Sequence, residues 1–367
     1  MSATSESVLN TTMRKYFRGE IVAVLRSRKL LAMLESRGQI TFNNSGADSG
    51  DDDMQWQVRF KQNELQGFDE TTVLTFGNIN RHKKATLPWR GYIMPEGMHY
   101  LDRLKNRGSE ALINKWSSIA EWMMQDVREN LGPELYVDGN AAGNTQKLHG
   151  IESFMSVSGA LASSLVGDPN DTYAGLATAL GNYGGSWTGT WPVGSGSATY
   201  DFWSPIVVDY TNTAWPQSTK TWPYTALDAT RYGLMKARRN DDVDNMISVV
   251  IHEQEMFRNF VTLFQTEERL NIIKGREGGS SGLVKLGFGD ILNFDGTDIT
   301  WEFGCPSNVG YGWCMGALEL ACLGEELVDV QGPSFDPASQ TERFWVAMPM
   351  NLKFKTVRNF LKFSAIS

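Results

Sequence analysis

A long run of strand-like sequence between residues 54 and 94 constrains the fold of this chain more than any other feature. Trp56, Val58 and Phe60 alternate with polar residues, which is the pattern of a strand with one buried face. Two more strand-like pieces follow, TTVLTF and HKKATLPWRGYIM. A two-stranded ribbon is marginally stable alone, so we expect this excursion to rest on another surface, often a second copy of the chain.

The clearest predicted helix covers residues 109–130, where apolar residues recur at spacings of three and four. Ser109 can cap its start, and Gly132-Pro133 is expected to stop it. The apolar face is broad, which favours packing of this helix against a sheet.

The N-terminal segment, residues 7–37, also has helical periodicity, with many Arg and Lys residues between Ile21, Leu25 and Leu31. It is predicted to be a basic helix. Two interpretations remain open: an arm that lies on a neighbouring subunit, or a surface helix with a solvated basic face.

The second half of the chain mixes helices and strands without a regular βαβ alternation. Helices are predicted at residues 224–239 and in HEQEMFRNFVTLFQTEERLNI, with the buried strand MISVVI between them. Strands lie on both sides of an Asp295-Gly296 turn, and the last two strands are expected to join around Asn351. This order of elements predicts an α+β fold.

The middle of the chain, residues 151–224, is rich in Gly, Ser, Thr and Trp and is predicted to form loops and short strands. Its tryptophans either anchor long loops and subunit contacts or stack on sugars. The second possibility supports an alternative function, a carbohydrate-binding or carbohydrate-active β-rich protein. The tryptophans are Trp187, Trp191, Trp203, Trp215 and Trp222.

Composition excludes several classes of protein. With 367 residues and 41% hydrophobic content, the chain can bury a sizeable core. A net charge of −8 would repel a phosphate backbone, so specific nucleic-acid binding is not expected. No run of about 18 apolar residues and no secretory signal pattern occurs, so we expect no membrane association and synthesis in the cytoplasm.

Two motifs resemble chemical sites, but each lacks an essential residue. His252-Glu253 begins like a zinc-protease helix, yet Met256 stands where the second histidine is needed, and His252 is interpreted as a helix-start or boundary residue. Residues 139–147 resemble a phosphate loop, but Gln146 replaces the glycine required before Lys147. We therefore predict no catalytic residue, cofactor or metal site.

The three cysteines, Cys305, Cys314 and Cys322, fit neither a zinc pattern nor a redox dithiol. Cys314 and Cys322 lie within apolar runs. All three are predicted to be buried thiols.

The order of these elements resembles that of the Hong Kong 97-type major capsid proteins of tailed bacteriophages. Residues 7–37 look like the family's N-terminal arm, residues 54–94 like its extended E-loop, and residues 109–130 like the spine helix of its P domain. ISVVIHEQEMFRNF, LGFGDILNFDGTDI and SNVGYGWCMGALELACL are similar to parts of its A domain, and NLKFKTVRNFLKFSAI resembles its closing strands.

The resemblance implies an HK97-like capsid fold and a division of the chain into five parts. These are an arm (1–40), an E-loop region (41–100), a P domain with the spine helix (101–150), an A domain with parts returning to P (151–335), and C-terminal strands (336–367).

The same resemblance implies a structural protein and not an enzyme. Its copies would assemble as hexamers and pentamers into an icosahedral virion capsid that encloses double-stranded DNA. Scaffolding, portal and cement or decoration proteins are expected as further partners. Another virion structural protein, such as a tail tube or decoration protein, is a second alternative.

The candidate inter-subunit contacts lie in and near the strand-rich excursion. For each aromatic residue among them, burial within one subunit is the open alternative. The candidates are Trp56, Arg59, Trp89, Arg90 and the acidic turn Asp51, Asp52 and Asp53.

Overall fold

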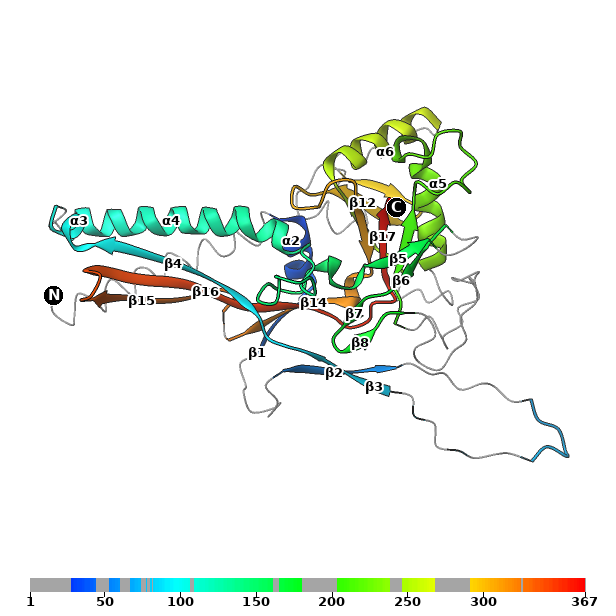
Figure 1. The fold of residues 1–367 in the computed structure, drawn as a ribbon, viewed down its shortest axis with the longest axis horizontal. Helices are drawn as coiled ribbons and strands as arrows, with labels where there is room; N and C mark the ends of the chain where they lie inside the picture. The colour runs from blue at the N-terminus through cyan, green and yellow to red at the C-terminus, as the bar shows by residue number, and fades with distance from the viewer. Residues whose placement is uncertain are drawn as a thin grey trace.

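The computed structural model describes most of the chain. The described residues are 28–43, 53–59, 67–73, 77, 80, 82–105, 109–160, 165–179, 203–237, 246–267, 291–324 and 326–366. They form an elongated molecule with a long thin part, a thicker part and a two-stranded ribbon along one side, and residues 67–73 extend away from the rest (Figure 1). The predictions made for Ile21, Leu25, Trp187 and Trp191 lie outside the described residues.

The long thin part, called the plate below, is a helix that lies along three antiparallel strands of a five-stranded sheet (Figure 1). Phe344, Val346 and Met348 on the central strand are buried in the same core as Met123 and Val127 of the helix. The expected packing of the long helix on a sheet is therefore confirmed. The plate consists of β4 (Gly91–His99), α3 (Tyr100–Lys105), α4 (Ser109–Glu134), β15 (Asp329–Asp336) and the central strand β16 (Thr341–Phe354).

The central strand is longer than the sequence pattern predicts. β16 continues through Asn351, where a turn was expected, and pairs beyond the plate with β14 (Leu318–Leu323), which in turn pairs with β1 (Ile40–Asn43). The chain turns only before β17 (Phe360–Ser364). The predicted turn is wrong because the Asn351 side chain finds buried hydrogen-bond partners inside the fold and needs no solvent.

The long helix ends at Glu134, one residue after the predicted stop at Gly132-Pro133, so α4 includes the proline. Proline has no N–H for the carbonyl of Glu129. Nη2 of Arg28 donates to that carbonyl at 3.2 Å and compensates for the missing bond.

The described end of the predicted basic N-terminal helix is α2 (Lys29–Ser36). Its apolar residues are all buried in the core of this subunit. They are Leu30, Leu31, Ala32, Met33 and Leu34. This part of the segment is therefore a core helix, and the proposed arm function concerns only the residues before it.

The thicker part contains a six-stranded mixed sheet, called the second sheet below, with two helices against it (Figure 1). The helices are α5 (Trp222–Ala237) and α6 (Gln254–Glu267), both as predicted. The predicted turn is confirmed, with positive φ at Asp295 (49°) and Gly296 (80°). In order across the sheet, the strands are β11 (Leu292–Phe294), β12 (Thr297–Trp301), β10 (Val249–His252), β13 (Gly310–Trp313), β17 and β9 (Ile206–Asp209).

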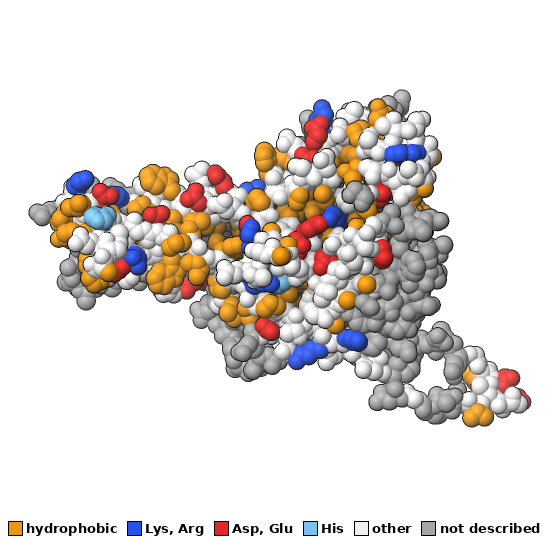
Figure 2. Space-filling view, in the orientation of Figure 1, with side chains coloured by type: hydrophobic (Ala, Val, Ile, Leu, Met, Phe, Trp, Pro, Cys, Tyr) orange, Lys and Arg blue, Asp and Glu red, His pale blue; other side chains and the backbone are white. Residues whose placement is uncertain are grey.

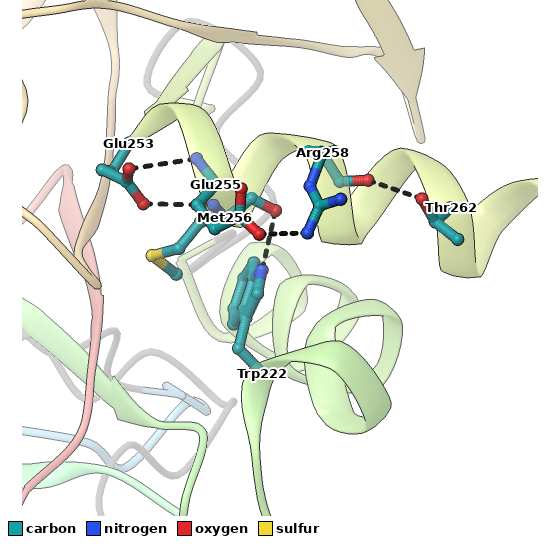
Figure 3. A network of polar contacts seen from close by, with 6 residues as sticks. All are labelled: Trp222, Glu253, Glu255, Met256, Arg258 and Thr262. Carbon is teal, nitrogen blue, oxygen red and sulfur yellow. Dashed lines mark hydrogen bonds and ion pairs between the residues drawn. The ribbon is translucent and has the colours of Figure 1, made fainter.

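Figure 3 shows the structural role of Glu253, the second residue of the motif His252-Glu253. Glu253 precedes α6, and its carboxylate accepts hydrogen bonds from the N–H groups of Glu255 (3.0 Å) and Met256 (3.2 Å). It therefore caps the helix N-terminus. The indole of Trp222, at the start of α5, donates to the carbonyl of Met256 at 2.9 Å and joins the two helices.

The residues around the glycine-rich middle form short elements, as predicted for the described ranges. The remaining elements are η1 (Ile151–Phe154), β5 (Val157–Ala160), β6 (Gly167–Pro169), β7 (Thr172–Tyr173), β8 (Leu176–Ala177) and η4 (Met315–Ala317).

The strand-rich excursion predicted for residues 54–94 contains a ribbon of two antiparallel strands, β2 (Met54–Arg59) and β3 (His82–Leu87), whereas residues 91–94 belong to β4 of the plate. Met54 and Val58 are buried on one face, which confirms the alternation. The prediction of a strand at TTVLTF is wrong for residues 71–73, which lie in a turn and the coil after it. The side chain of Asp69 binds the N–H and the hydroxyl of Thr71, and this local bonding favours a turn over a strand.

Candidate inter-subunit surfaces

Trp56 and Arg59 lie on the ribbon strand β2. Trp56 is half-buried, its indole donates to the carbonyl of Lys355 at 3.2 Å, and its ring lies 6.4 Å from that of Tyr173. Much of this side chain is therefore used within the subunit. Arg59 is exposed near the outer end of β2. A contact with a neighbour stays a prediction for both residues.

Trp89 and Arg90 lie between the ribbon and the plate. Trp89 is partly buried against the main core. One guanidinium nitrogen of Arg90 donates to the carbonyls of Gly139 (2.8 Å), Asn144 (3.3 Å) and Lys147 (2.6 Å). Arg90 thus binds three backbone carbonyls of the loop whose sequence resembles a phosphate loop. Its guanidinium is used for these carbonyls and not for a phosphate. Its inter-subunit role stays a prediction.

The predicted acidic turn is described only in part. Asp53 is half-buried and directly precedes β2, whereas Asp51 and Asp52 lie outside the described residues. The structure brings Trp56, Arg59 and Asp53 onto one strand and its start, and places Trp89 and Arg90 just after β3. Because Met54 pairs with Leu87 and Arg59 pairs with His82, Asp53 and Trp89 follow one end of the ribbon, whereas Arg59 lies at the other end.

The most exposed apolar side chains among the described residues lie at the far end of the excursion and are not among the seven candidate contacts (Figure 1). Phe68 is 83% exposed and Val73 is 88% exposed. We call residues 67–73 the tip. Figure 2 shows it separated from the other described residues, and none of these covers its apolar side chains.

The tip has a defined local structure. Oδ1 of Asp69 accepts hydrogen bonds from the hydroxyl of Thr72 (2.7 Å), the hydroxyl of Thr71 (2.9 Å) and the N–H of Thr71 (3.0 Å). These bonds lower the pKa of Asp69, with the bond from Thr72 contributing most. Because the turn is already ordered, the apolar residues beside it lose less conformational entropy when they bind another surface.

A second apolar surface is the face of the plate that points away from α4. Ile93 is 69% exposed on β4, and Trp345 is 39% exposed near it on β16. Arg343 and Asp336 form an ion pair at 2.7 Å farther along this part of the sheet. We call the face of the plate that carries Ile93 and Trp345 the open face. An apolar centre beside an ion pair is typical of a surface that another molecule covers.

The described tryptophans of the glycine-rich middle argue against sugar stacking. Trp203, Trp215 and Trp222 are at most 5% exposed, and Trp215 and Trp222 donate their indole N–H groups to backbone carbonyls. Rings buried in this way have no free face for a sugar. Their role as anchors of loops and helices is therefore confirmed.

His252 ends β10, directly before the cap of α6, so its interpretation as a boundary residue is confirmed. It is completely buried among the rings of Trp222, Phe260 and Phe363. Within the described structure neither ring nitrogen has a hydrogen-bond partner, and burial lowers the pKa of His252 to about 3.

We expect this histidine to make the subunit sensitive to acid. The unfolded chain takes up a proton at the ordinary pKa of 6.5, but the folded chain does so only near 3. Between these two pKa values the unfolded state binds more protons than the folded state, so the free energy of unfolding falls as pH falls. His252 alone lowers it by about 2 kcal/mol at pH 5. His149, with a pKa lowered to about 4, acts in the same direction, whereas Asp171, with a pKa raised to about 6, opposes it.

Urea unfolding of the unassembled subunit at pH 7 and pH 5 tests this expectation. The variant His252→Phe should lose about 2 kcal/mol less stability on acidification than the parent chain. His82→Gln, at an exposed position, is the control and should behave like the parent. Equal acid sensitivity of parent and His252→Phe would contradict the assignment.

The described residues were also compared with the predictions on metal ligands, cysteines and membrane helices. They include no group of three or more His, Cys, Asp and Glu side chains able to hold a metal ion. Cys305, Cys314 and Cys322 are free thiols and buried, as predicted, and burial raises the pKa values of Cys305 and Cys322. Among the helices of the described ranges, none combines the length and apolarity needed to cross a membrane.

Comparison with known proteins identifies the fold. No protein-family model and no curated protein matches this chain. A chain of the cyanophage A-1(L) capsid asymmetric unit, 13% identical, superimposes with a TM-score of 0.58 over 92% of this chain and 92% of its own. A chain from the capsid of the native GTA particle, 11% identical, does so with a TM-score of 0.51 over 91% of each chain. This protein therefore has the α+β fold of the Hong Kong 97-type capsid proteins, as the order of its elements predicts.

Proposed function

We propose that this chain is a major capsid protein whose copies assemble into the icosahedral head of a tailed phage. The observation that carries the proposal is the extent of the likeness, which covers 92% of both this chain and the cyanophage capsid chain. Such coverage leaves little of the chain for a further domain. The exposed apolar residues of the tip and the open face also suit a subunit that neighbouring copies cover.

Within this proposal, the named parts of the capsid fold are assigned to elements of the structure. The ribbon β2–β3 with its tip acts as the E-loop, and α4 acts as the spine helix of the P domain. The second sheet with α5 and α6 belongs to the A domain, and residues before α2 act as the N-terminal arm. These assignments are supported by element order and by the extended position of the ribbon (Figure 1).

The proposed mechanism of assembly is the repetition of many weak contacts between copies. Subunits pack as hexamers and pentamers around their A domains, and the tip reaches a neighbouring copy. The open face of the plate offers an apolar surface for such a contact. The net charge of −8 agrees with a container that encloses double-stranded DNA without specific binding. Scaffolding, portal and decoration proteins are proposed as further partners.

Negative-stain electron microscopy tests the proposal. The protein is expressed alone, passed over a sizing column and imaged. We expect rings of about six subunits or closed shells, because identical subunits with complementary surfaces form closed symmetric assemblies. A monodisperse monomer of 41.0 kDa at every concentration would contradict the proposed function.

A further inference from the structure

The plate and the second sheet meet where the turn after β12 touches the end of α4. A Cβ atom at Gly304, in that turn, would lie 2.6 Å from the carbonyl carbon of Gly132, in the last turn of the helix. The two backbones therefore approach each other without a side chain between them. We call residues 132–137 and 301–305 the joint.

The carboxyl group of Glu302 connects the two sides of the joint. The hydroxyl of Tyr136, two residues after α4, donates to Oε2 of Glu302 at 2.6 Å. The glutamate is only 5% exposed, and its Oε1 is buried without a hydrogen-bond partner among the described residues. A carboxylate in such a place costs much more free energy than a protonated carboxyl group, because the charge has lost its water.

Two cations lie near Glu302 but bind backbone carbonyls. Arg28 donates to carbonyls near the end of α4, and Nζ of Lys29 donates to the carbonyl of Trp301 at 2.7 Å. Burial raises the pKa of Glu302 above its ordinary value of 4.5. It outweighs the bond from Tyr136, the N–H of Lys29 and the charges of both cations, which all act to lower this pKa.

A second pair of tyrosine and glutamate, beside the first, shows what Glu302 lacks. The rings of Tyr136 and Tyr311 stack with their centres 5.6 Å apart, and the hydroxyl of Tyr311 donates to Oε2 of Glu152 at 2.6 Å. Glu152 also forms an ion pair with Lys362, and its side chain is 26% exposed. Its charge therefore has a cation in contact and access to water.

The other titratable groups that face Glu302 stay neutral. They are the hydroxyl of Tyr136 and the thiol of Cys305, and burial raises the pKa of each well above its ordinary value. Proton uptake and release at this joint is therefore assigned to the carboxyl group of Glu302 alone.

We propose that Glu302 makes the joint between the plate and the second sheet sensitive to pH, with the joint most stable when this side chain is protonated. The protonated group still accepts the bond from Tyr136 and places no charge in the core. Ionisation buries a charge that opening of the joint would hydrate, so the open state gains population. The inference concerns one subunit and does not rest on the proposed function.

The direction of this effect follows from the raised pKa of Glu302. The folded joint holds the proton more tightly than the open or unfolded chain does. The stabilisation is therefore fully present below pH 4.5 and is lost as pH rises through the raised pKa. This sign is opposite to that of His252, which destabilises the subunit in acid.

Hydrogen exchange of the full-length, unassembled chain at pH 5 and pH 7.5 tests the proposal. The amides of Tyr136 and Cys305 report on the joint, because they donate to the carbonyls of Pro133 and Glu302. After correction for intrinsic rates, we compare exchange in the parent with exchange in Glu302→Gln, which cannot ionise. The ratio of parent to variant should rise at least about twofold from pH 5 to pH 7.5. The effects of the buried histidines are common to both chains and cancel in this ratio.

The matched control is Glu152→Gln, which neutralises the neighbouring glutamate of the same arrangement. It removes the ion pair with Lys362, so the joint should not become more stable than in the parent at high pH. For this variant the ratio of parent to variant should not rise between pH 5 and pH 7.5.

A ratio for Glu302→Gln that stays constant or falls between the two pH values would overturn the proposal. If this variant does not fold, Tyr136→Phe takes its place. It keeps Glu302 and removes the hydroxyl that lowers the pKa of the carboxyl group, so joint exchange should depend on pH more strongly than in the parent. An equal or weaker dependence counts against the proposal.

Discussion

Replacement of both Phe68 and Val73 by serine is expected to abolish particle formation and to leave the subunit folded. The two side chains are 83% and 88% exposed, so the isolated subunit gains almost nothing from them. Burying them on a neighbour contributes about 3 kcal/mol or more per tip, which is at least a hundredfold in the association constant of each contact. Because a shell repeats the contact in every subunit, a loss of this size prevents closure.

Particle yield by electron microscopy and subunit stability by urea unfolding measure the two halves of this prediction. The matched control is the variant with Phe68→Leu and Val73→Ile, which keeps both positions apolar and should still assemble. Asp69→Ala should have an intermediate effect, because it removes the bonds from Thr71 and Thr72 that hold the turn and leaves the apolar residues in place. Normal particle yield from the serine variant would show that the tip is not an inter-subunit contact.

Replacement of Asn351 by leucine is expected to cost the subunit about 4 kcal/mol of unfolding free energy. The Asn351 side chain is completely buried and accepts from the N–H of His149 at 2.8 Å. Its amide nitrogen lies 2.9 Å from the carbonyl of Pro88 and 3.0 Å from Nδ1 of His149. Leucine has a similar size but leaves these buried groups without partners.

The comparison with Met350→Leu isolates the polar effect. Met350 is the neighbouring residue of β16 and is also completely buried, and a volume-conserving change there should cost less than about 1.5 kcal/mol. Urea unfolding of the unassembled subunits, followed by tryptophan fluorescence, gives both values. If the two variants are equally stable, the hydrogen bonds of Asn351 make no net contribution to the fold.

Elements with a strong local pattern were predictable from the sequence. The helix at residues 109–130 has regular apolar spacing, and the turn at Asp295-Gly296 requires positive φ, which these residue types tolerate. The order of elements was sufficient to predict the capsid fold. β15 was not predicted as a separate strand, because its Gly332-Pro333 pair is more typical of a turn, and a register shift accommodates the pair in the sheet.

The candidate contact residues were chosen by type and place in the excursion. Two of them have partners within the subunit. The ring of Trp56 lies near Tyr173, and the guanidinium of Arg90 binds three loop carbonyls. Phe68 is not among the predicted contact residues because it stands in a polar stretch without periodicity. The signal available in the sequence was Asp69 followed by Thr71 and Thr72, a pattern that favours a side-chain-bonded turn.

The sequence by itself determined the longer helices, many of the strands and their order, because periodicity and turn chemistry act over a few residues. Only the tertiary structure decided how Pro133 and Asn351 are used. Arg28 lies 101 residues from Glu129, whose carbonyl it binds beside Pro133, and His149 lies 202 residues from Asn351. A helix or strand usually ends near proline or asparagine because polar groups there need water as a hydrogen-bond partner. It can continue past them when the fold supplies a partner from a distant part of the sequence.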